Sequence, residues 1–334
     1  MSESQENLWD YDAVAPGQAG APTVVTLNAA HVADYARVAQ NPDPRYAVTG
    51  ANVEYGGALV AMPTMVLTYA PLLRDEIAER EGFVALEQSR TARRQTPFAK
   101  CEIRWLRPVC AGDTLTGTRR VLEKYERRGS CFVTFRVEAS NQRGEDVARY
   151  DYTCIFSYAK GQQDVPREPG TAPLRPPDAD PAWTSAAHAR WLTFDSVAIG
   201  DPLAPLAISE SQEIMLRKND FRLAGKHRPS NIHTDEAFAR QNIFGGMVNS
   251  GPATLSYIDQ MLQRSFPLRA FYGGGSLLMR AITPFRAGDT VTFAGEVTGK
   301  RIEDGHRIVA CRVRGTNQRG ELVCLSDAAM VLPD

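Results

Sequence analysis

The side chains best suited to chemistry in this chain lie in residues 225–252, GKHRPSNIHTDEAFARQNIFGGMVNSGP. His233 stands just before a predicted short helix, and the pair Gly245-Gly246 leads into a second, apolar helix that starts near Pro252. An imidazole can accept and release a proton near neutral pH, so it is suited to acid–base chemistry. A histidine and small polar residues held between two helices predict a reaction site.

This stretch resembles the signature of the MaoC-like enoyl-CoA hydratases and dehydratases, in the double-hotdog form. The family's usual run is roughly Gly-Asp-x-Asn-Pro-Leu/Ile-His, then an Asp/Glu-rich helix, a Gly-Gly pair and a His-Gly step. His233, the glycine pair and Gly251 stand where the signature has them. Arg228 holds the place of the family's catalytic aspartate, and Ser230-Asn231 holds the place of its Asn-Pro pair.

The resemblance implies hydration of a 2-enoyl thioester or dehydration of a 3-hydroxyacyl thioester. That reaction needs a base, an acid and hydrogen-bond donors for an enolate-like oxygen. The resemblance makes His233 the catalytic histidine and the backbone amide of Gly251 the oxyanion donor, because the first amides of a helix are unpaired at its positive end. It also implies a set of substrate-binding residues: Arg228, Ser230, Asn231, Asn249 and Ser250.

Arg228 leaves the reaction open, because a guanidinium is no base at neutral pH and disfavours protonation of a neighbouring His233. In one interpretation His233 works alone, or with Asp235 or a substrate carboxylate as second group, although Asp235 is more typical of a first-turn helix residue. In another, Arg228 binds the carboxylate of a dicarboxylic acyl thioester. In a third, the chain is an inactive double-hotdog subunit that binds acyl thioesters or a partner enzyme.

The chain contains an internal repeat. Residues 103–114 recur at 279–290 and residues 141–145 recur at 317–321, and both matches share the same shift of 176 positions. Two chance matches would rarely share a register, so the chain is predicted to be a tandem duplication. The predicted parts are an N-terminal hotdog domain over 1–160, a Pro-rich linker over 161–190, and a C-terminal MaoC-like hotdog domain over 191–334.

Each copy shows the same order of predicted elements. A short helix (about 29–39 and 209–223) is followed by a longer apolar helix from Pro63 or Pro252, since proline suits the first turn of a helix. Alternating patterns predict strands over 115–123, 130–138 and 146–158, then over 291–297, 306–315 and 322–332. The fold class is therefore α+β: an antiparallel sheet wrapped around a central helix in each half, with the two sheets joined edge to edge. Residues 73–96 are predicted to be a solvated loop rather than a flap over a pocket.

The first copy carries a weaker version of the motif, Asn41-Pro42-Asp43-Pro44-Arg45-Tyr46. Aligned on the second copy, Asn41 takes the aspartate position and Tyr46 the histidine position, and Asp43 is typical of an Asx turn. We therefore expect the first half to shape an acyl pocket and to perform no chemistry.

Composition limits the other functions. With 38 Lys+Arg against 39 Asp+Glu, the chain offers no bulk charge that would bind nucleic acid or an anionic membrane. It starts without the basic and apolar regions of a signal peptide, and a cytoplasmic location is expected. Its six scattered cysteines suggest neither a metal site nor a disulfide framework. No cofactor is expected beyond coenzyme A as part of the substrate. The expected partners are an acyl-CoA or acyl-carrier thioester and, through the fold, a second copy or another hotdog protein.

Overall fold

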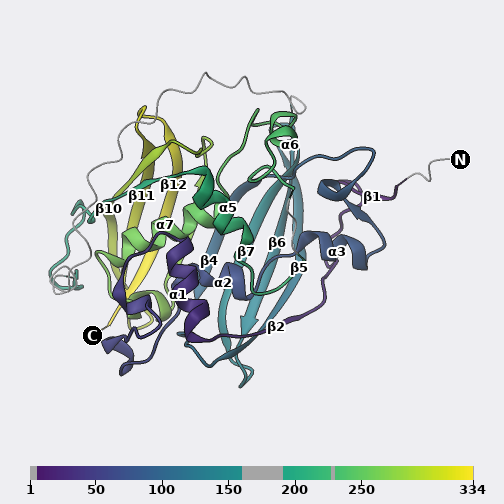
Figure 1. The fold of residues 1–334 in the computed structure, drawn as a ribbon. Helices are drawn as coiled ribbons and strands as arrows, with labels where there is room; N and C mark the ends of the chain where they lie inside the picture. Colours follow the sequence, from purple (N-terminus) through teal and green to yellow (C-terminus); the bar gives the residue numbers. More distant parts are fainter. Residues whose placement is uncertain (1–5, 160–190, 227–229, 334) are drawn as a thin grey trace, which may run out of the picture.

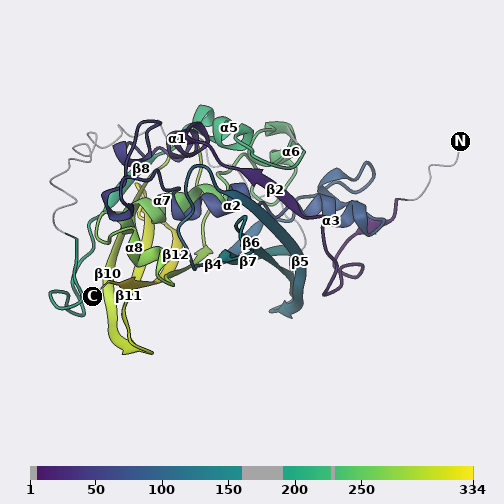
Figure 2. The ribbon, with the colours of Figure 1, turned by 90° about the horizontal axis from the view of Figure 1, so that it is seen from below.

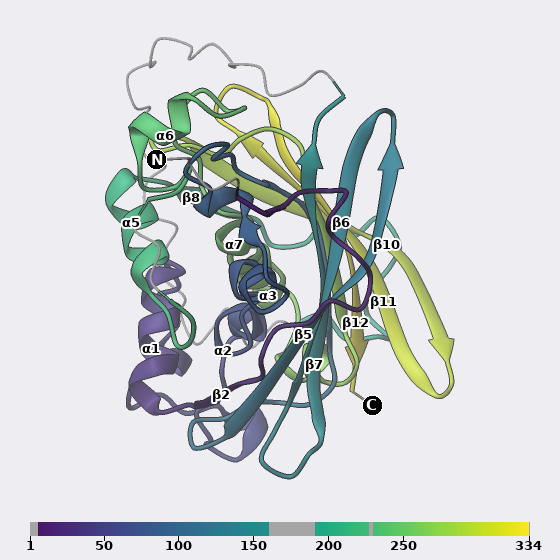
Figure 3. The ribbon, with the colours of Figure 1, turned by 90° about the vertical axis from the view of Figure 1, so that its right-hand side faces the viewer.

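The computed structural model describes residues 6–159, 191–226 and 230–333. Arg228 and the predicted linker therefore lie outside the described residues. The described chain is built around one ten-stranded antiparallel sheet, in the order β2-β5-β6-β7-β4-β9-β12-β11-β10-β8. The helices cover one face of this sheet, and the long hairpins β5–β6 and β10–β11 curve away from the helices (Figures 2 and 3).

Each half of the chain contributes one half of the sheet (Figure 1). The first half supplies β2 (Thr23–Thr26), β4 (Phe98–Trp105), β5 (Thr114–Arg127), β6 (Ser130–Ser140) and β7 (Asp146–Ser157). The second half supplies β8 (Leu206–Ser209), β9 (Ser276–Ala281), β10 (Thr290–Glu303), β11 (His306–Asn317) and β12 (Leu322–Leu332). The halves meet where β4 pairs with β9, with Ile103 opposite Leu277. The predicted double hotdog with edge-to-edge sheets is confirmed.

Seven α-helices lie among the described residues: α1 (Ala29–Val38), α2 (Val66–Tyr69), α3 (Arg74–Arg80), α5 (Gln212–Asp220), α6 (Glu236–Arg240), α7 (Gly251–Gln263) and α8 (Arg269–Tyr272). Helix α7 is the central one, because every residue from Ala253 to Gln263 is buried. Its start is set by Ser250, whose side chain accepts the Ala253 N–H at 3.3 Å, and by Pro252 in the first turn.

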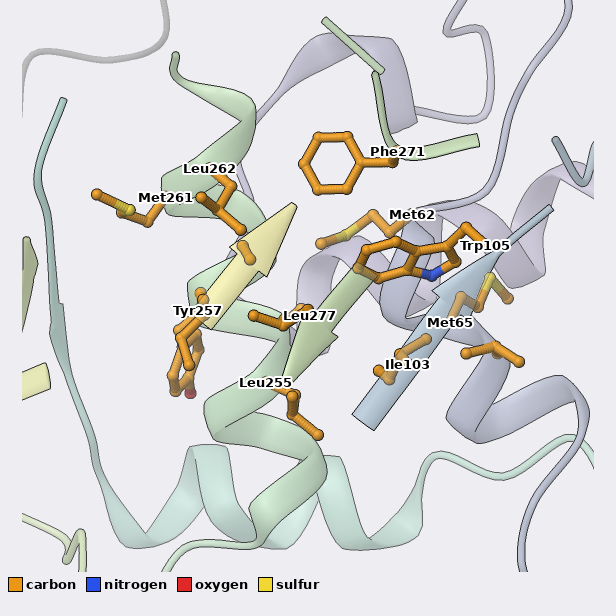
Figure 4. Close-up of a cluster of buried hydrophobic side chains, with 14 of the residues drawn as sticks. Met62, Met65, Ile103, Trp105, Leu255, Tyr257, Met261, Leu262, Phe271 and Leu277 are labelled. Carbon is orange, nitrogen blue, oxygen red and sulfur yellow. The ribbon is translucent and has the colours of Figure 1, made fainter. Parts of the chain in front are cut away.

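The core lies between the central helix and the sheet. Figure 4 shows Leu255, Tyr257 and Met261 of α7 in one buried cluster with Ile103 and Leu277, which come from strands of the two halves. Trp105 closes this core from the first half, with its ring against Phe271 at 5.4 Å between centroids. The two halves therefore share one apolar core, which fixes them relative to each other.

The first half departs from the prediction of a long helix after Pro63. A 3₁₀ turn (Pro63–Met65) and the four residues of α2 are all that form. Ala70 leaves the helical conformation (φ −127°, ψ 70°) and Pro71 follows it. A residue before proline is disfavoured in the helical region, so the helix ends there.

Residues 73–96 are also not the solvated loop that the sequence predicted. They form α3, a 3₁₀ turn (Leu86–Gln88) and the short strand β3 (Val84–Ala85), which pairs in parallel with β1 (Leu8–Trp9). Ile77 and Leu86 are buried against Trp9 in a second, smaller apolar cluster. The prediction was wrong because this packing depends on a residue far away in the sequence.

No helix in the described part of the chain is long and apolar enough to cross a membrane. Across the same ranges no cluster of three or more His, Cys, Asp or Glu side chains could hold a metal ion. All six cysteines are free thiols.

Candidate active site

His233 lies in the loop before α6, where its backbone and its ring are both fixed. The Asn231 side chain accepts the His233 backbone N–H at 2.8 Å in an Asx turn. The ring atom Nδ1 is 2.7 Å from the carbonyl oxygen of Val248. A carbonyl only accepts hydrogen bonds, so Nδ1 carries the hydrogen and Nε2 keeps a free lone pair.

The surroundings keep this imidazole neutral. Burial lowers the pKa of His233 below its ordinary 6.5, and the positive charges of Arg74 and Arg222 lower it further, against the opposite effect of the Val248 hydrogen bond. Within the described ranges no carboxylate forms an ion pair with His233. At neutral pH the group is therefore a base with its lone pair on Nε2.

Two cavities meet at His233. The larger, of about 530 Å³, runs beside strands of both halves, and the smaller, of about 210 Å³, lies toward α5. His233 and Asn249 line both of them. The wall of the larger cavity is mostly apolar and comes from both halves, including Phe98, Phe132, Tyr152, Ile155, Tyr158, Ile243, Phe244, Met279, Ile282 and Phe285. Such a cavity suits an apolar chain that ends at the imidazole.

The start of α7 borders the larger cavity at Gly251. Pro252 has no N–H, and the next two amides, of Ala253 and Thr254, are taken up by the side chain and carbonyl of Ser250. The Gly251 N–H has no hydrogen-bond partner among the described residues. The glycine is needed here, because a Cβ atom would lie 2.5 Å from the Phe98 ring.

The other predicted site residues divide into two groups. Asn249 and Ser250 border the smaller cavity beside His233. Ser230 and Asn231 instead line a third cavity, of about 270 Å³, together with Arg222 and Lys226. The Ser230 hydroxyl donates to the Asp235 carboxylate.

Asp235 acts as the N-cap of α6, since its side chain accepts the Phe238 N–H at 3.0 Å. Hydrogen bonds from Ser230 and from the helix amides lower the pKa of Asp235. This carboxylate caps the helix, as its sequence position indicated, and it lines neither of the two cavities at His233.

A buried polar cluster beside Asn249 escaped the sequence analysis. The Glu210 atom Oε2 accepts hydrogen bonds from Asn249 Nδ2 (2.7 Å), Tyr257 OH (2.8 Å) and Lys218 Nζ (2.8 Å). Burial raises the pKa of Glu210 and lowers that of Lys218 to about 8. The available signal was the alternation of β8, which places Glu210 on the inward face with Leu206 and Ile208.

The polar side chains of the first-half motif are buried or hydrogen-bonded within the protein. The Tyr46 ring is 1% exposed and its hydroxyl donates to Gln263 of α7 at 2.6 Å. Asn41 is also buried, and the Asp43 side chain accepts the Arg45 N–H at 2.9 Å, which confirms the predicted Asx turn. The second-half motif contains the same kind of Asx turn, from Asn231 to His233.

The comparisons with known proteins agree with this architecture. Residues 211–318 match the family model described as MaoC like domain, and residues 15–150 match the model described as FAS1-like, dehydratase domain region. The chain is a MaoC-like double-hotdog protein. The search among curated protein sequences found no match for this MaoC-like chain.

Three solved structures are similar to this MaoC-like protein over more than nine-tenths of its length. A MaoC domain protein dehydratase from Chloroflexus aurantiacus is 15% identical, with 99% of both chains covered and a TM-score of 0.67. A MaoC-like dehydratase from Phytophthora capsici is 14% identical, with 94% of this chain and 95% of that chain covered and a TM-score of 0.62. A Mycobacterium tuberculosis protein described as a double hotdog fold is 16% identical, with 96% and 98% covered and a TM-score of 0.59. At these identities the likeness shows the fold.

Proposed function

We propose that this chain adds water across the double bond of a 2-enoyl thioester, or removes it from a 3-hydroxyacyl thioester. The observation that carries the proposal is the neutral His233, whose free Nε2 stands where an apolar cavity meets the start of α7. The family match supports a hydratase or dehydratase. The reaction needs no cofactor beyond the thioester substrate itself, as coenzyme A or acyl-carrier thioester.

In the forward direction His233 Nε2 takes a proton from water while the water oxygen bonds to C3 of the enoyl group. The electron pair of the double bond moves toward the thioester oxygen, where the Gly251 amide donates a hydrogen bond to the developing charge. The imidazolium then returns the proton to C2. Because the surroundings lower the pKa of His233, the protonated ring gives its proton up readily.

The first half supplies the acyl pocket in this proposal. Its side chains Phe98, Phe132, Tyr152 and Ile155 line the larger cavity, and no chemistry is assigned to its own motif. The division into an acyl-pocket domain over 1–160, a linker over 161–190 and an active-site domain over 191–334 is part of the same proposal. Ser230 and Asn231 then bind the part of the substrate outside the acyl cavity, where Arg222 and Lys226 also lie.

Binding of an acyl thioester without turnover is the second candidate. It is favoured by one observation: Arg228 stands at the family's aspartate position, and the described residues offer no carboxylate paired with His233. Arg228 lies outside the described residues. Its proposed contact with a substrate carboxylate is tested by comparing dicarboxylic enoyl-CoAs with the other enoyl-CoAs.

The purified chain should be incubated with crotonyl-CoA, with longer enoyl-CoAs and with dicarboxylic enoyl-CoAs, and loss of enoyl absorbance followed. We expect turnover, and a loss of about 10²–10⁴-fold in His233→Asn, which keeps a donor for the Val248 carbonyl but removes the base. His306→Asn is the matched control, since His306 is exposed at the start of β11. No turnover of any substrate, with saturable binding of butyryl-CoA by calorimetry, would leave the binding role in place of the enzymatic one.

A further inference from the structure

We propose that Glu210 is a positioning residue for this reaction: it locks the carboxamide of Asn249, which binds the water that His233 deprotonates. The inference rests on the proposed function and adds to it a second group at the water, in place of the carboxylate that the sequence lacks at position 228. It starts from a carboxylate that the mechanism above does not use.

The Glu210 side chain is fully buried and holds its partners from three elements. Lys218 comes from α5, Tyr257 from α7, and Asn249 from the loop before α7. All three donate to the same oxygen, Oε2. A buried ion pair is costly to desolvate and seldom improves stability over apolar packing, so its presence beside a cavity calls for another role.

The carboxamide of Asn249 has a single orientation. Its Oδ1 accepts the Ser250 N–H at 2.9 Å, and one Nδ2 hydrogen goes to Glu210. Glu210 is a carboxylate acceptor and the Ser250 amide is a donor, so the oxygen and nitrogen of Asn249 cannot exchange places. One Nδ2 hydrogen remains for a ligand, in a side chain that lines both cavities.

Asn249 and His233 are held by consecutive residues. The Val248 carbonyl fixes the His233 ring, and Asn249 is the next residue in the chain. A water that accepts the remaining Asn249 N–H has its own hydrogen available for His233 Nε2. A donor at that place orients the water without taking its proton, so His233 remains the only base.

The first half shows that the fold itself does not need this carboxylate. Leu27 occupies the same backbone position there: its N–H donates to Asp113 and its carbonyl accepts from Gly112, both at 2.9 Å. Glu210 makes the same pair of bonds, to Asp289 and from Gly288, also at 2.9 Å. Where the first half buries a leucine, the second half buries a charged group beside its histidine.

The test measures kcat and KM on an enoyl-CoA that the wild-type chain turns over. Asn249→Ala should lower kcat by about 10²-fold, the effect of removing one placed donor, with KM nearly unchanged. The double variant Glu210→Leu with Lys218→Met removes the anchor and its counter-ion together, and it should lower kcat by a similar factor. In the Asn249→Ala background this pair should lower kcat no further, since groups that act as a unit are not additive.

Two controls separate positioning from folding. Glu210→Gln with Lys218→Met keeps an acceptor for Asn249 and should restore most of kcat. Asp43→Leu with Arg45→Met removes a buried ion pair from the first half and should leave kcat of the folded protein unchanged. Additive losses of kcat, or a wild-type kcat in Asn249→Ala while His233→Asn is inactive, would overturn this inference and leave the proposed function standing. A wild-type chain without turnover overturns both.

Discussion

The two halves of this protein contain the same turn and use it differently. In the first half the turn from Asp43 to Arg45 closes on its own charges: Arg45 pairs with Asp43 at 2.6 Å and with Glu54 at 3.5 Å. In the second half the turn from Asn231 to His233 leaves the imidazole with one hydrogen bond, to a backbone carbonyl, and a ring that faces two cavities. The same turn therefore presents an arginine that pairs with neighbouring carboxylates in the first half, and an imidazole beside two cavities in the second.

The lengths of the two central helices account for the difference. Helix α7 of the second half extends to Gln263, which fills the space beside the first turn and accepts the Tyr46 hydroxyl. Helix α2 of the first half ends at Tyr69, before Pro71. Thr68 and Pro71, near the end of α2, line the smaller cavity beside His233. The short helix α2 thus leaves room for a cavity beside His233, whereas the long helix α7 leaves none beside the first-half turn.

The largest expected effect is on the first-half turn. Arg45→Met leaves the carboxylates of Asp43 and Glu54 buried without their cation, which should cost about 3–5 kcal/mol of stability. Arg37→Met is the matched control, because the Arg37–Asp34 pair is exposed and is worth about 0–1 kcal/mol. Urea unfolding of both variants measures the loss in free energy of unfolding. Loss of turnover in folded Arg45→Met, without loss of stability, would give the first turn a chemical role.

Gly251 tests the second half. In Gly251→Ala the new methyl group meets the Phe98 ring, which is packed on Tyr152 at 4.9 Å between centroids. We expect a loss of about 1–3 kcal/mol from overpacking and a fall of about 10²-fold in kcat/KM from displacement of the proposed oxyanion donor. Gly299→Ala on β10 is the control, since its methyl would lie at ordinary contact distance, 3.5 Å, from Ala310. Equal kinetics in both variants would remove Gly251 from the site.

The sequence predicted the six long strands β5, β6, β7, β10, β11 and β12, because strand alternation and turns are local. It gave no ranges for β2, β4, β8 and β9. It predicted the long helix after Pro252 but not the short one after Pro63, although Pro71 was visible. The fold of residues 73–96 depends on burial against Trp9, which no local pattern records.

The residues of the candidate site also divide into those that a local motif marks and those that only tertiary contacts bring together. His233 and Gly251 could be located because a contiguous motif carries them. Alternation marks Glu210 only as an inward-facing residue, since its partners Lys218 and Tyr257 meet it after three separate elements have packed together. Sequence patterns therefore pointed to the candidate site, and tertiary contacts added the polar cluster beside it.

The pH dependence of turnover tests whether His233 acts as a neutral, desolvated base. Since His233 must be neutral to act as a base and its pKa lies below 6.5, kcat/KM should be constant near pH 7 and fall tenfold per unit below that lowered pKa. The same shift makes stability fall as the pH drops below 6.5, because the unfolded state then binds more protons than the folded one. Stopped assays across pH 4.5–8 measure the first effect, a range chosen around the ordinary histidine pKa of about 6.5. An acid limb above 6.5 would contradict a desolvated imidazole.

The smallest effect is expected from Tyr46. Tyr46→Phe removes one buried hydroxyl and leaves the Gln263 oxygen with fewer donors, so it should cost about 1–2 kcal/mol of stability while kcat stays at the wild-type value. Tyr35→Phe, which removes the buried hydroxyl bonded to Thr64 at 3.1 Å, should behave alike. If Tyr46→Phe abolished turnover and His233→Asn did not, the reacting half would be the first one. That result would also mean that a substrate fits beside Tyr46, where Gln263 fills the space in this structure.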